Sequence, residues 1–420
     1  MNKQGFTTRS LHTRYTDLRH QKSINKDMIQ PMIKRIFLVL PFLFVLTMVS
    51  FSQYSTPDTT VQKRSLIGKT TDLADKMIDM VTWEKPKYTF SLFPVGGYSP
   101  RTGFEFGVMP VFRINTQEET GSKYNRSTTI APYFMVSTKG MYSFDIDMVA
   151  FTKRQWFFIV KTQYMHMPDT YYGIGNGDKE EPYTEYNLQQ FTFTGDILKG
   201  WKDKFFIGIK TDLNYSDNTD IDGDLLDPAV PGYYGGWANG IGPLVSFDTR
   251  DNISYPSKGW FVTASALWYL GNAFGDYAFN AYNVDVRKFF SIKEDKSIIA
   301  AQAYLNLTDG NTPFYKLSAL GGKRFLRGIP SPLKYIDNNV WYVQAEYRQH
   351  IWWKVGAVVF AGTGRAFSTF DDTLFKDLHF AGGAGIRFRV LPDDGLNLRL
   401  DFGMTNRGDN AIYLTLREAF

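Results

Sequence analysis

The chain of 420 residues contains no cysteine. This absence excludes disulfide bonds, thiolate metal sites and cysteine nucleophiles. Long apolar runs are also missing, and the mean hydropathy of the chain is low. A transmembrane helix needs about 20 consecutive apolar residues. The composition therefore argues against a helical membrane protein.

A strong charge of one sign is absent once the N-terminal residues are set aside. The whole chain has a formal charge of +5. Residues 1–52 contain eight of its lysines and arginines but only two aspartates, which leaves a formal charge of −1 on the remainder. A nearly neutral remainder offers no electrostatic footprint for nucleic acid. We therefore expect no nucleic-acid partner.

Complete catalytic or metal-binding motifs are missing too. The five histidines form no His-Glu-x-x-His pair, and Gly-Tyr-Ser at 97–99 lacks the closing glycine of a nucleophile elbow. Residues 218–223 imitate the start of a calcium loop, but Ala229 stands where that loop needs glutamate. We therefore predict no enzyme, no catalytic residue, no metal site and no cofactor.

Aromatic residues, by contrast, are abundant at 16% of the chain, which suits strands and membrane-interface girdles better than helices. From Tyr88 onward, apolar and polar residues alternate. In residues 396–404, for example, three leucines, a phenylalanine and a methionine alternate with Asn, Arg, Asp and Gly. Because successive side chains of a strand point to opposite faces, one face of this segment is apolar and the other is charged.

Sixteen segments with this alternation are predicted to be strands. They are 88–99, 103–114, 126–138, 141–152, 154–165, 185–198, 202–215, 239–249, 259–271, 276–290, 295–307, 339–352, 354–363, 376–390, 394–404 and 411–420. Many are longer than the strands of a soluble sandwich, which usually have 3–10 residues.

The connections between these segments alternate in length. The longest ones fall on the side away from the N-terminus, at 166–184, 216–238, 308–338 and 364–375. Most of the others are tight, although 115–125 is an exception. Short periplasmic turns, longer outer loops and an even number of strands are typical of outer-membrane barrels. The sequence thus predicts an all-β fold: a 16-stranded antiparallel transmembrane β-barrel over residues 88–420, with an inward-folded loop and a short periplasmic segment before it.

The residues ahead of the barrel are predicted to serve targeting. Residues 1–52 form an N-terminal extension and a signal peptide, in which Met-Ile-Lys-Arg at 32–35 precedes an apolar run at 36–49 and small residues follow it. That run is too short to span a membrane. Residues 53–87 are expected to form the short periplasmic segment, where 71–83 has the spacing of an amphipathic helix.

One outer connection combines a cation with a flexible backbone position. Residues 320–330 contain Arg327 directly before Gly328. On the next predicted strand, Glu346 lies in the polar row, which faces the lumen. A guanidinium inside a barrel is costly unless it is paired, and its planar fork suits a carboxylate. We therefore predict that this connection folds into the lumen and that Arg327, Gly328 and Glu346 form a loop lock. The alternative is an exposed arginine in a surface loop.

Three motifs resemble the BamA/TamA-like outer-membrane protein 85 superfamily, whose members include bacterial surface antigen barrels. They are Tyr-Gly-Ile-Gly-Asn at 172–176, the strand-turn-strand at 246–260 and Leu-Arg-Gly-Ile at 326–329. The third is similar to the family's lumen-loop motif, Val/Ile-Arg-Gly-Phe/Tyr. Two positions depart from the family, because Ile329 replaces the usual aromatic and Gly362 replaces a frequent second carboxylate. The lock would then be weaker or differently built.

The resemblance implies a function in outer-membrane protein assembly and insertion, or in translocation. It also implies a weak seam between the first and last strands, and it makes Phe420 a C-terminal assembly signal for the barrel assembly machinery. Family members that insert or secrete proteins carry polypeptide-transport-associated (POTRA) domains, for which residues 53–87 are too few. We therefore expect periplasmic or outer-membrane partner subunits, besides outer-membrane lipid, at the bacterial cell outer membrane.

Two other functions stay open at this stage. The first is a plugged channel or structural barrel without insertase activity, in which residues 308–338 fill the lumen. The second is an outer-membrane hydrolase, for which the sequence offers no serine and histidine at a distinctive spacing.

Overall fold

A computed structural model describes residues 81–85, 87–99, 101–114, 128–152, 154–177, 183–202, 204–293, 296–370, 374–391, 396–416 and 418–420. One compact unit extends from Thr82 to Phe420. The predicted signal peptide and most of the segment at 53–87 lie outside the described residues. The described end of that segment forms strand β1 (Thr82–Lys85), so the helix expected over 71–83 does not include Trp83.

The compact unit consists of antiparallel strands. The long ones are β2 (Tyr88–Ser99), β3 (Gly103–Ile114), β4 (Thr128–Ser137), β5 (Tyr142–Phe151), β6 (Trp156–Tyr171), β7 (Thr184–Trp201), β8 (Phe205–Asp222), β9 (Gly236–Asp248), β10 (Gly259–Leu270), β11 (Ala278–Lys293), β12 (Ser297–Gly310), β15 (Asn339–Trp352), β16 (Val355–Phe367), β17 (His379–Leu391), β18 (Leu396–Thr405) and β19 (Asn410–Leu416). The connections hold two 3-10 helices, η1 (Gly271–Ala273) and η2 (Phe314–Lys316), and the short strand pair β13 (Ser318–Ala319) and β14 (Ile336–Asp337).

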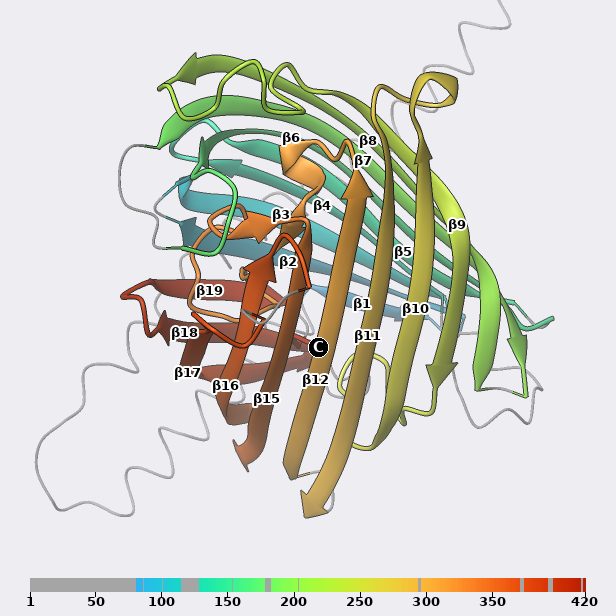
Figure 1. Cartoon of the computed structure of the whole chain (residues 1–420). Coiled ribbons are helices and arrows are strands. Elements are labelled where there is room, and N and C mark those ends of the chain that lie inside the picture. The colour runs from blue at the N-terminus through green and yellow to red at the C-terminus, as the bar shows by residue number, and fades with distance from the viewer. Residues whose placement is uncertain are drawn as a thin grey trace, which may run out of the picture. The chain divides into compact units, whose positions relative to one another are not determined.

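The sixteen long strands follow one another as neighbours in a single sheet (Figure 1). Strands β2 to β12 pair in chain order, β12 then pairs with β15, and the order continues to β19. Strand β19 in turn lies beside β2. One antiparallel sheet that contains all sixteen long strands confirms the predicted fold class, an antiparallel transmembrane barrel. Within the described ranges, no helix is both long and apolar enough to cross a membrane.

The two faces of the sheet follow from the alternation in the sequence. In β18, Phe402 and Met404 are exposed, whereas Asn397, Arg399 and Asp401 are buried. An apolar row on the outside and a polar row on the inside are the pattern of a barrel in lipid. The buried polar row of this strand therefore faces the interior.

Two strands extend well beyond the residues that the alternation predicts. Strand β6 continues to Tyr171 and β8 continues to Asp222, so they occupy the first part of the expected outer connections at 166–184 and 216–238. The extension of β8 consists mostly of Ser, Asp, Asn and Thr and has no apolar row, and its Ser216 and Asn218 side chains are buried. The last strand is shorter than predicted: β19 ends at Leu416 rather than at residue 420.

An apolar cluster lies at the outer end of the barrel. Phe314, in the connection between β12 and β15, is fully buried against Tyr171 of β6 and Tyr186 of β7. Lys316 of the same connection pairs with Asp212 of β8 at 2.5 Å. The connection thereby contacts the strands on the far side of the barrel.

Candidate functional site

The connection from 311 to 338 folds back on itself inside the barrel. Its two limbs meet where the Leu320 amide donates to the Tyr335 carbonyl at 2.9 Å. Leu320, Leu326, Ile329 and Tyr335 are all buried in one cluster with Tyr342 of β15. Burial of these apolar side chains holds the loop against the inner wall.

Two glycines allow the loop to approach the wall closely. Gly328 has φ of +133°, and a Cβ there would lie 2.9 Å from the main-chain nitrogen of Met404. On β18, a Cβ at Gly403 would lie 2.4 Å from the Arg327 carbonyl oxygen. Neither position has room for a side chain, so backbone packs directly on backbone.

Arg327 is buried between two carboxylates from different strands. Its Nη2 lies 2.5 Å from Glu346 Oε2 on β15, and its Nη1 lies 2.7 Å from Asp401 Oδ2 on β18. The guanidinium also sits 3.6 Å from the ring centroid of Phe360 on β16. The Arg327 side chain is 1% exposed and both carboxylate side chains are 0% exposed, so these pairs are shielded from solvent.

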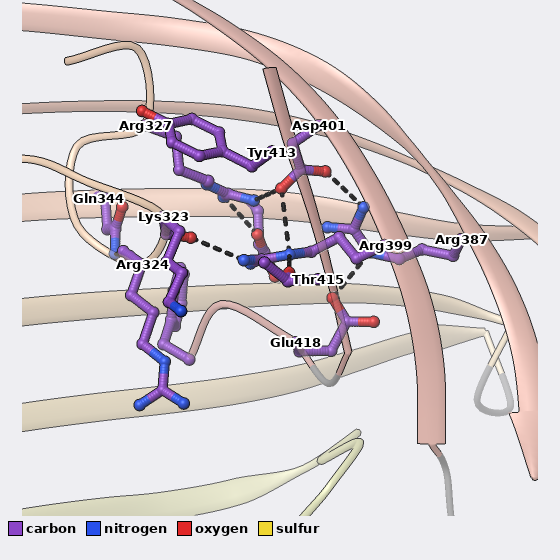
Figure 2. Close-up of polar contacts among 12 residues, drawn as sticks. Lys323, Arg324, Arg327, Gln344, Arg387, Arg399, Asp401, Tyr413, Thr415 and Glu418 are labelled. Atoms are coloured by element: carbon purple, nitrogen blue, oxygen red, sulfur yellow. Dashed lines mark hydrogen bonds and ion pairs between the residues drawn. The ribbon is translucent and has the colours of Figure 1, made fainter. Parts of the chain in front are cut away.

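The same two carboxylates bind further arginines of the wall. Asp401 Oδ1 accepts from Arg387 Nη1 at 2.5 Å, and Glu346 Oε1 accepts from Arg348 Nε at 2.6 Å. Arg399 lies beside Asp401 and donates to the Lys323 carbonyl of the loop at 2.7 Å. Figure 2 shows Asp401 between the side chains of Arg327, Arg387 and Arg399. Each carboxylate therefore joins the loop to the wall.

The end of the chain attaches to the same arginines. Glu418 accepts from Arg387 Nε at 2.8 Å and from Asn397 Nδ2 at 2.7 Å. The Phe420 carbonyl oxygen accepts from Arg348 Nη2 at 2.8 Å. Burial alone would raise the pKa of Glu418, but Arg387 and Arg348 outweigh it and hold that pKa below its usual value. Residues 418–420 are thus bound inside the barrel.

Two relays of charged contacts consequently link the loop to residues 418–420. One passes from Arg327 through Glu346 and Arg348 to Phe420. The other passes from Arg327 through Asp401 and Arg387 to Glu418. Removing one member of a buried ion pair leaves an uncompensated charge, which costs about 3–5 kcal/mol.

The structure brings two predicted residues of the loop lock together and adds a third that was not predicted. Arg327 and Glu346 are in contact, and Gly328 lies at the predicted bend. The second carboxylate was sought at position 362, which is glycine. Asp401 supplies it from β18 instead. Its position in the charged row of residues 396–404 was the available signal, but a sequence does not show which row lies beside the loop.

Phe420, predicted to be an assembly signal, lies in a buried cluster with Ala419, Phe289 of β11 and Ala300 of β12. The inward rows of β11 and β12 therefore receive the end of the chain. A role for Phe420 in assembly stays a prediction.

The motif at 172–176 lies against the lumen loop. Gly175 forms an isolated bridge with Ile336, the residue that starts β14. Asn176 accepts from the Ala366 amide at 2.9 Å and donates to the Asp377 carbonyl at 2.8 Å. The motif thereby joins the outer end of the loop to β16 and to the connection that precedes β17.

The motif at 246–260 lies beside the buried arginines and carboxylates of the loop lock. Its turn is braced by Asp251, which accepts from the Ser257 amide at 2.9 Å. Pro256 accepts from Arg348 Nη1 at 3.4 Å, and the Tyr255 ring centroid lies 5.5 Å from the Arg348 guanidinium. The three motifs therefore lie close to one another. One contains Arg327, one contacts the loop at Ile336, and one contacts Arg348 of β15.

This arrangement has the geometry of a structural anchor. Among the described residues, no group of three or more histidine, cysteine or acidic side chains could hold a metal ion. The carboxylates at the site are occupied by arginines at 2.5–2.8 Å. The site therefore fixes the positions of chain segments relative to one another.

The fold and this anchor define a transmembrane barrel whose lumen holds a loop fastened by a buried arginine. Residues 115–416 match the family model described as the Omp85 superfamily domain. The chain belongs to the Omp85 superfamily, and the family predicted from its motifs is confirmed.

Solved structures show the same fold at low identity. BamA from Haemophilus ducreyi lacking POTRA domains 1–3 is 12% identical, with a TM-score of 0.53 over 80% of this chain and 70% of that chain. CdiB from Escherichia coli is also 12% identical, with a TM-score of 0.51 over 80% of this chain and 62% of that chain. No curated protein matches the sequence.

Proposed function

We propose that this barrel acts in the bacterial outer membrane in the assembly and insertion of outer-membrane proteins, or in their translocation. Partner proteins in the periplasm or outer membrane would deliver its substrates. The proposed function involves no chemical reaction, and the buried ion pairs around Arg327 would serve as a structural anchor. The loop lock of Arg327, Gly328 and Glu346, extended by Asp401, would keep one side of the seam rigid.

The observation that carries this proposal is the construction of the seam between β2 and β19. Strand β2 pairs with β3 over all twelve of its residues, whereas on the other side residues 88–91 pair with the four-residue β1. Strand β19 has only seven residues, and residues 418–420 bind inside the barrel. A sheet edge that lacks a full-length neighbour can accept another strand.

Reconstitution tests this function. The purified chain is placed in liposomes, and a urea-unfolded eight-stranded barrel is added as substrate. Faster appearance of the folded, heat-modifiable substrate band than in empty liposomes would support insertase activity. Equal rates, with and without an extract of periplasmic and outer-membrane proteins that could supply partners, would exclude it.

A plugged channel without insertase activity is the second candidate. The buried cluster around Phe314 lies at the outer end of the loop, and the remainder of the loop packs against the inner wall. These contacts suit a barrel whose conductance is kept low. Ion conductance that responds to the loop, without any effect of the chain on substrate folding, would favour this candidate.

A further inference from the structure

Strand β1 occupies part of the seam. Its residues pair antiparallel with β2 from Thr82 opposite Ser91 to Lys85 opposite Tyr88. The same stretch of β2 pairs with β3 on its other side. A strand has two edges, so β1 lies on the edge of β2 that faces β19.

β1 has the side-chain arrangement of a wall strand. Thr82 and Ser91 hydroxyls lie 3.3 Å apart on one face. On the other face, Trp83 stacks on Phe90 with ring centroids 5.3 Å apart, and Phe90 contacts Phe112 of β3 at 4.8 Å. The aromatic row of β2 and β3 thus continues onto β1.

β1 takes the place that the end of β19 would otherwise fill. Strand β19 runs antiparallel to β18 and stops at Leu416, which lies opposite Leu398 near the start of β18. Ala419 and Phe420 are buried against Phe289 and Ala300 instead of continuing the wall. The wall beside residues 88–91 is therefore built by a segment that precedes the barrel.

Apolar packing also joins the first strands of the sheet, β2 to β4, to strands β17 and β18. Phe93, Val111 and Ala131 of β2, β3 and β4 form a buried cluster against which Phe388 of β17 and Leu398 of β18 pack. Phe388 and Leu398 belong to rows whose other members face outward. Contacts of this kind are non-directional and fix no register, unlike a ladder of backbone hydrogen bonds.

We propose that β1 is a displaceable strand: an unfolded β-strand of a substrate pairs with residues 88–91 of β2 only after Thr82–Lys85 has left that edge. This inference rests on the proposed function and adds the step that limits access to the seam. Four cross-strand pairs hold β1, against twelve between β2 and β3. Because stabilisation of a sheet accrues pair by pair, β1 costs less to replace than β3 would.

Paired cysteines test this inference, since the chain has none of its own. T82C/S91C joins β1 to β2 at facing positions whose hydroxyls are already in contact. S246C/T263C is the matched control, because it joins a facing serine and threonine of β9 and β10 away from the seam. Both variants are oxidised in membranes and then reduced.

Oxidised T82C/S91C is expected to accelerate substrate folding about tenfold less than its reduced form, whereas S246C/T263C is expected to be indifferent to redox state. The urea-unfolded eight-stranded barrel is also expected to lower the yield of the disulfide in T82C/S91C when it is present during oxidation. The disulfide yield can be measured whether or not the substrate is inserted.

The outcomes separate the inference from the proposed function. If the T82C/S91C disulfide does not form, or if its yield is the same with and without the unfolded substrate, the inference is wrong. Equal insertion by the oxidised and reduced forms also overturns it, while leaving the proposed function intact. A lowered disulfide yield without any insertion supports displacement of β1 and excludes insertase activity. If residues 418–420, and not a substrate strand, pair with the edge that β1 leaves, the substrate will not change the yield of the T82C/S91C disulfide. That outcome contradicts the inference.

Discussion

At the scale of single residues, the molecule depends on a buried guanidinium with two carboxylate partners. Arg327 contacts Glu346 and Asp401 at 2.5 and 2.7 Å and lies over the Phe360 ring. A lysine could keep the charge but would have to choose between the carboxylates, because its ammonium lacks the planar fork. The geometry of the fork, and not the charge alone, is what joins the loop to both β15 and β18.

Replacing Arg327 tests this reading. R327A is expected to lower the free energy of unfolding by about 3–5 kcal/mol, because two carboxylates lose a shared partner in a buried site. R327K should recover only part of that loss. Urea unfolding in lipid vesicles, followed by heat-modifiable gel mobility, measures both. K210A, which breaks a more exposed pair with Asp196, serves as control. Wild-type stability in R327A would remove the loop lock.

A second residue-scale prediction concerns backbone contact. G403A should destabilise the barrel by about 1–3 kcal/mol, because the added methyl group would overlap the Arg327 carbonyl, which lies 2.4 Å from the Cβ position. G382A on β17 is the control, since its Cβ would lie 3.4 Å from the Phe360 carbonyl. The same unfolding assay compares them. Equal losses for both variants would contradict close packing at Gly403.

Much of this site follows from the sequence, but one feature required the fold. Glu346 falls in the inward row of its strand, and its pairing with Arg327 was predicted from the cost of an unpaired lumen charge. Asp401 is separated from Arg327 by 74 positions. Its row was evident from alternation, yet nothing local identifies which strand lies next to the loop. Local patterns fix the face of a residue and not its neighbours across the barrel.

At the scale of elements, the loop and the end of β19 are coupled. The relays through Glu346 and Arg348, and through Asp401 and Arg387, join Arg327 to residues 418–420 that it does not touch. Alternation predicted one strand over 411–420, because a period of two does not reveal a bend. The charged contacts of Glu418 inside the barrel end the strand at Leu416.

Thiol labelling can detect this coupling. A419C introduces a single thiol at a position that is 4% exposed in the wild type. In the A419C background, R327A should raise the rate of labelling by a soluble maleimide about tenfold, since Glu346 and Asp401 would lose Arg327 and would no longer fix the positions of Arg348 and Arg387, which bind residues 418–420. K210A in the same background should not. Unchanged labelling in R327A would show that the loop and the end of the chain are independent.

The protonation of Glu418 gives the same element a pH dependence. The pKa of Glu418 is lowered in the folded chain by Arg387 and Arg348, against the effect of burial. Its contribution to stability is therefore present above the unfolded pKa of about 4.3 and is lost as the pH falls through the lower folded pKa. E418Q should be less stable than wild type by about 1.5–3 kcal/mol at neutral pH, with a smaller gap in acid. Urea unfolding of both proteins at several pH values measures this difference. A stability difference between E418Q and wild type that does not change with pH would contradict the assignment.

At the scale of the whole molecule, the alternation from Tyr88 onward was sufficient to predict sixteen strands in a ring. The prediction succeeded because lipid outside and water inside impose one pattern on every strand. It was less successful for the extended parts of β6 and β8, because Tyr171 packs there against the connection that holds Phe314 and the added residues of β8 are mostly polar. The strand β1 also escaped it, because four residues are too few to show a period.

The lumen loop decides whether the interior conducts, and its removal distinguishes the two candidate functions. Replacing residues 320–332 by a short glycine–serine linker leaves the outer cluster around Phe314 and removes the chain that fills the lumen beside β15 and β18. Single-channel conductance in planar bilayers is expected to rise severalfold, because an aqueous path replaces buried apolar and charged side chains. R327A retains the loop and should give only intermittent openings. If the deletion raises conductance but leaves substrate insertion unchanged, the loop is a plug and not part of the insertion mechanism. If both change together, the loop holds the side of the seam on which insertion depends.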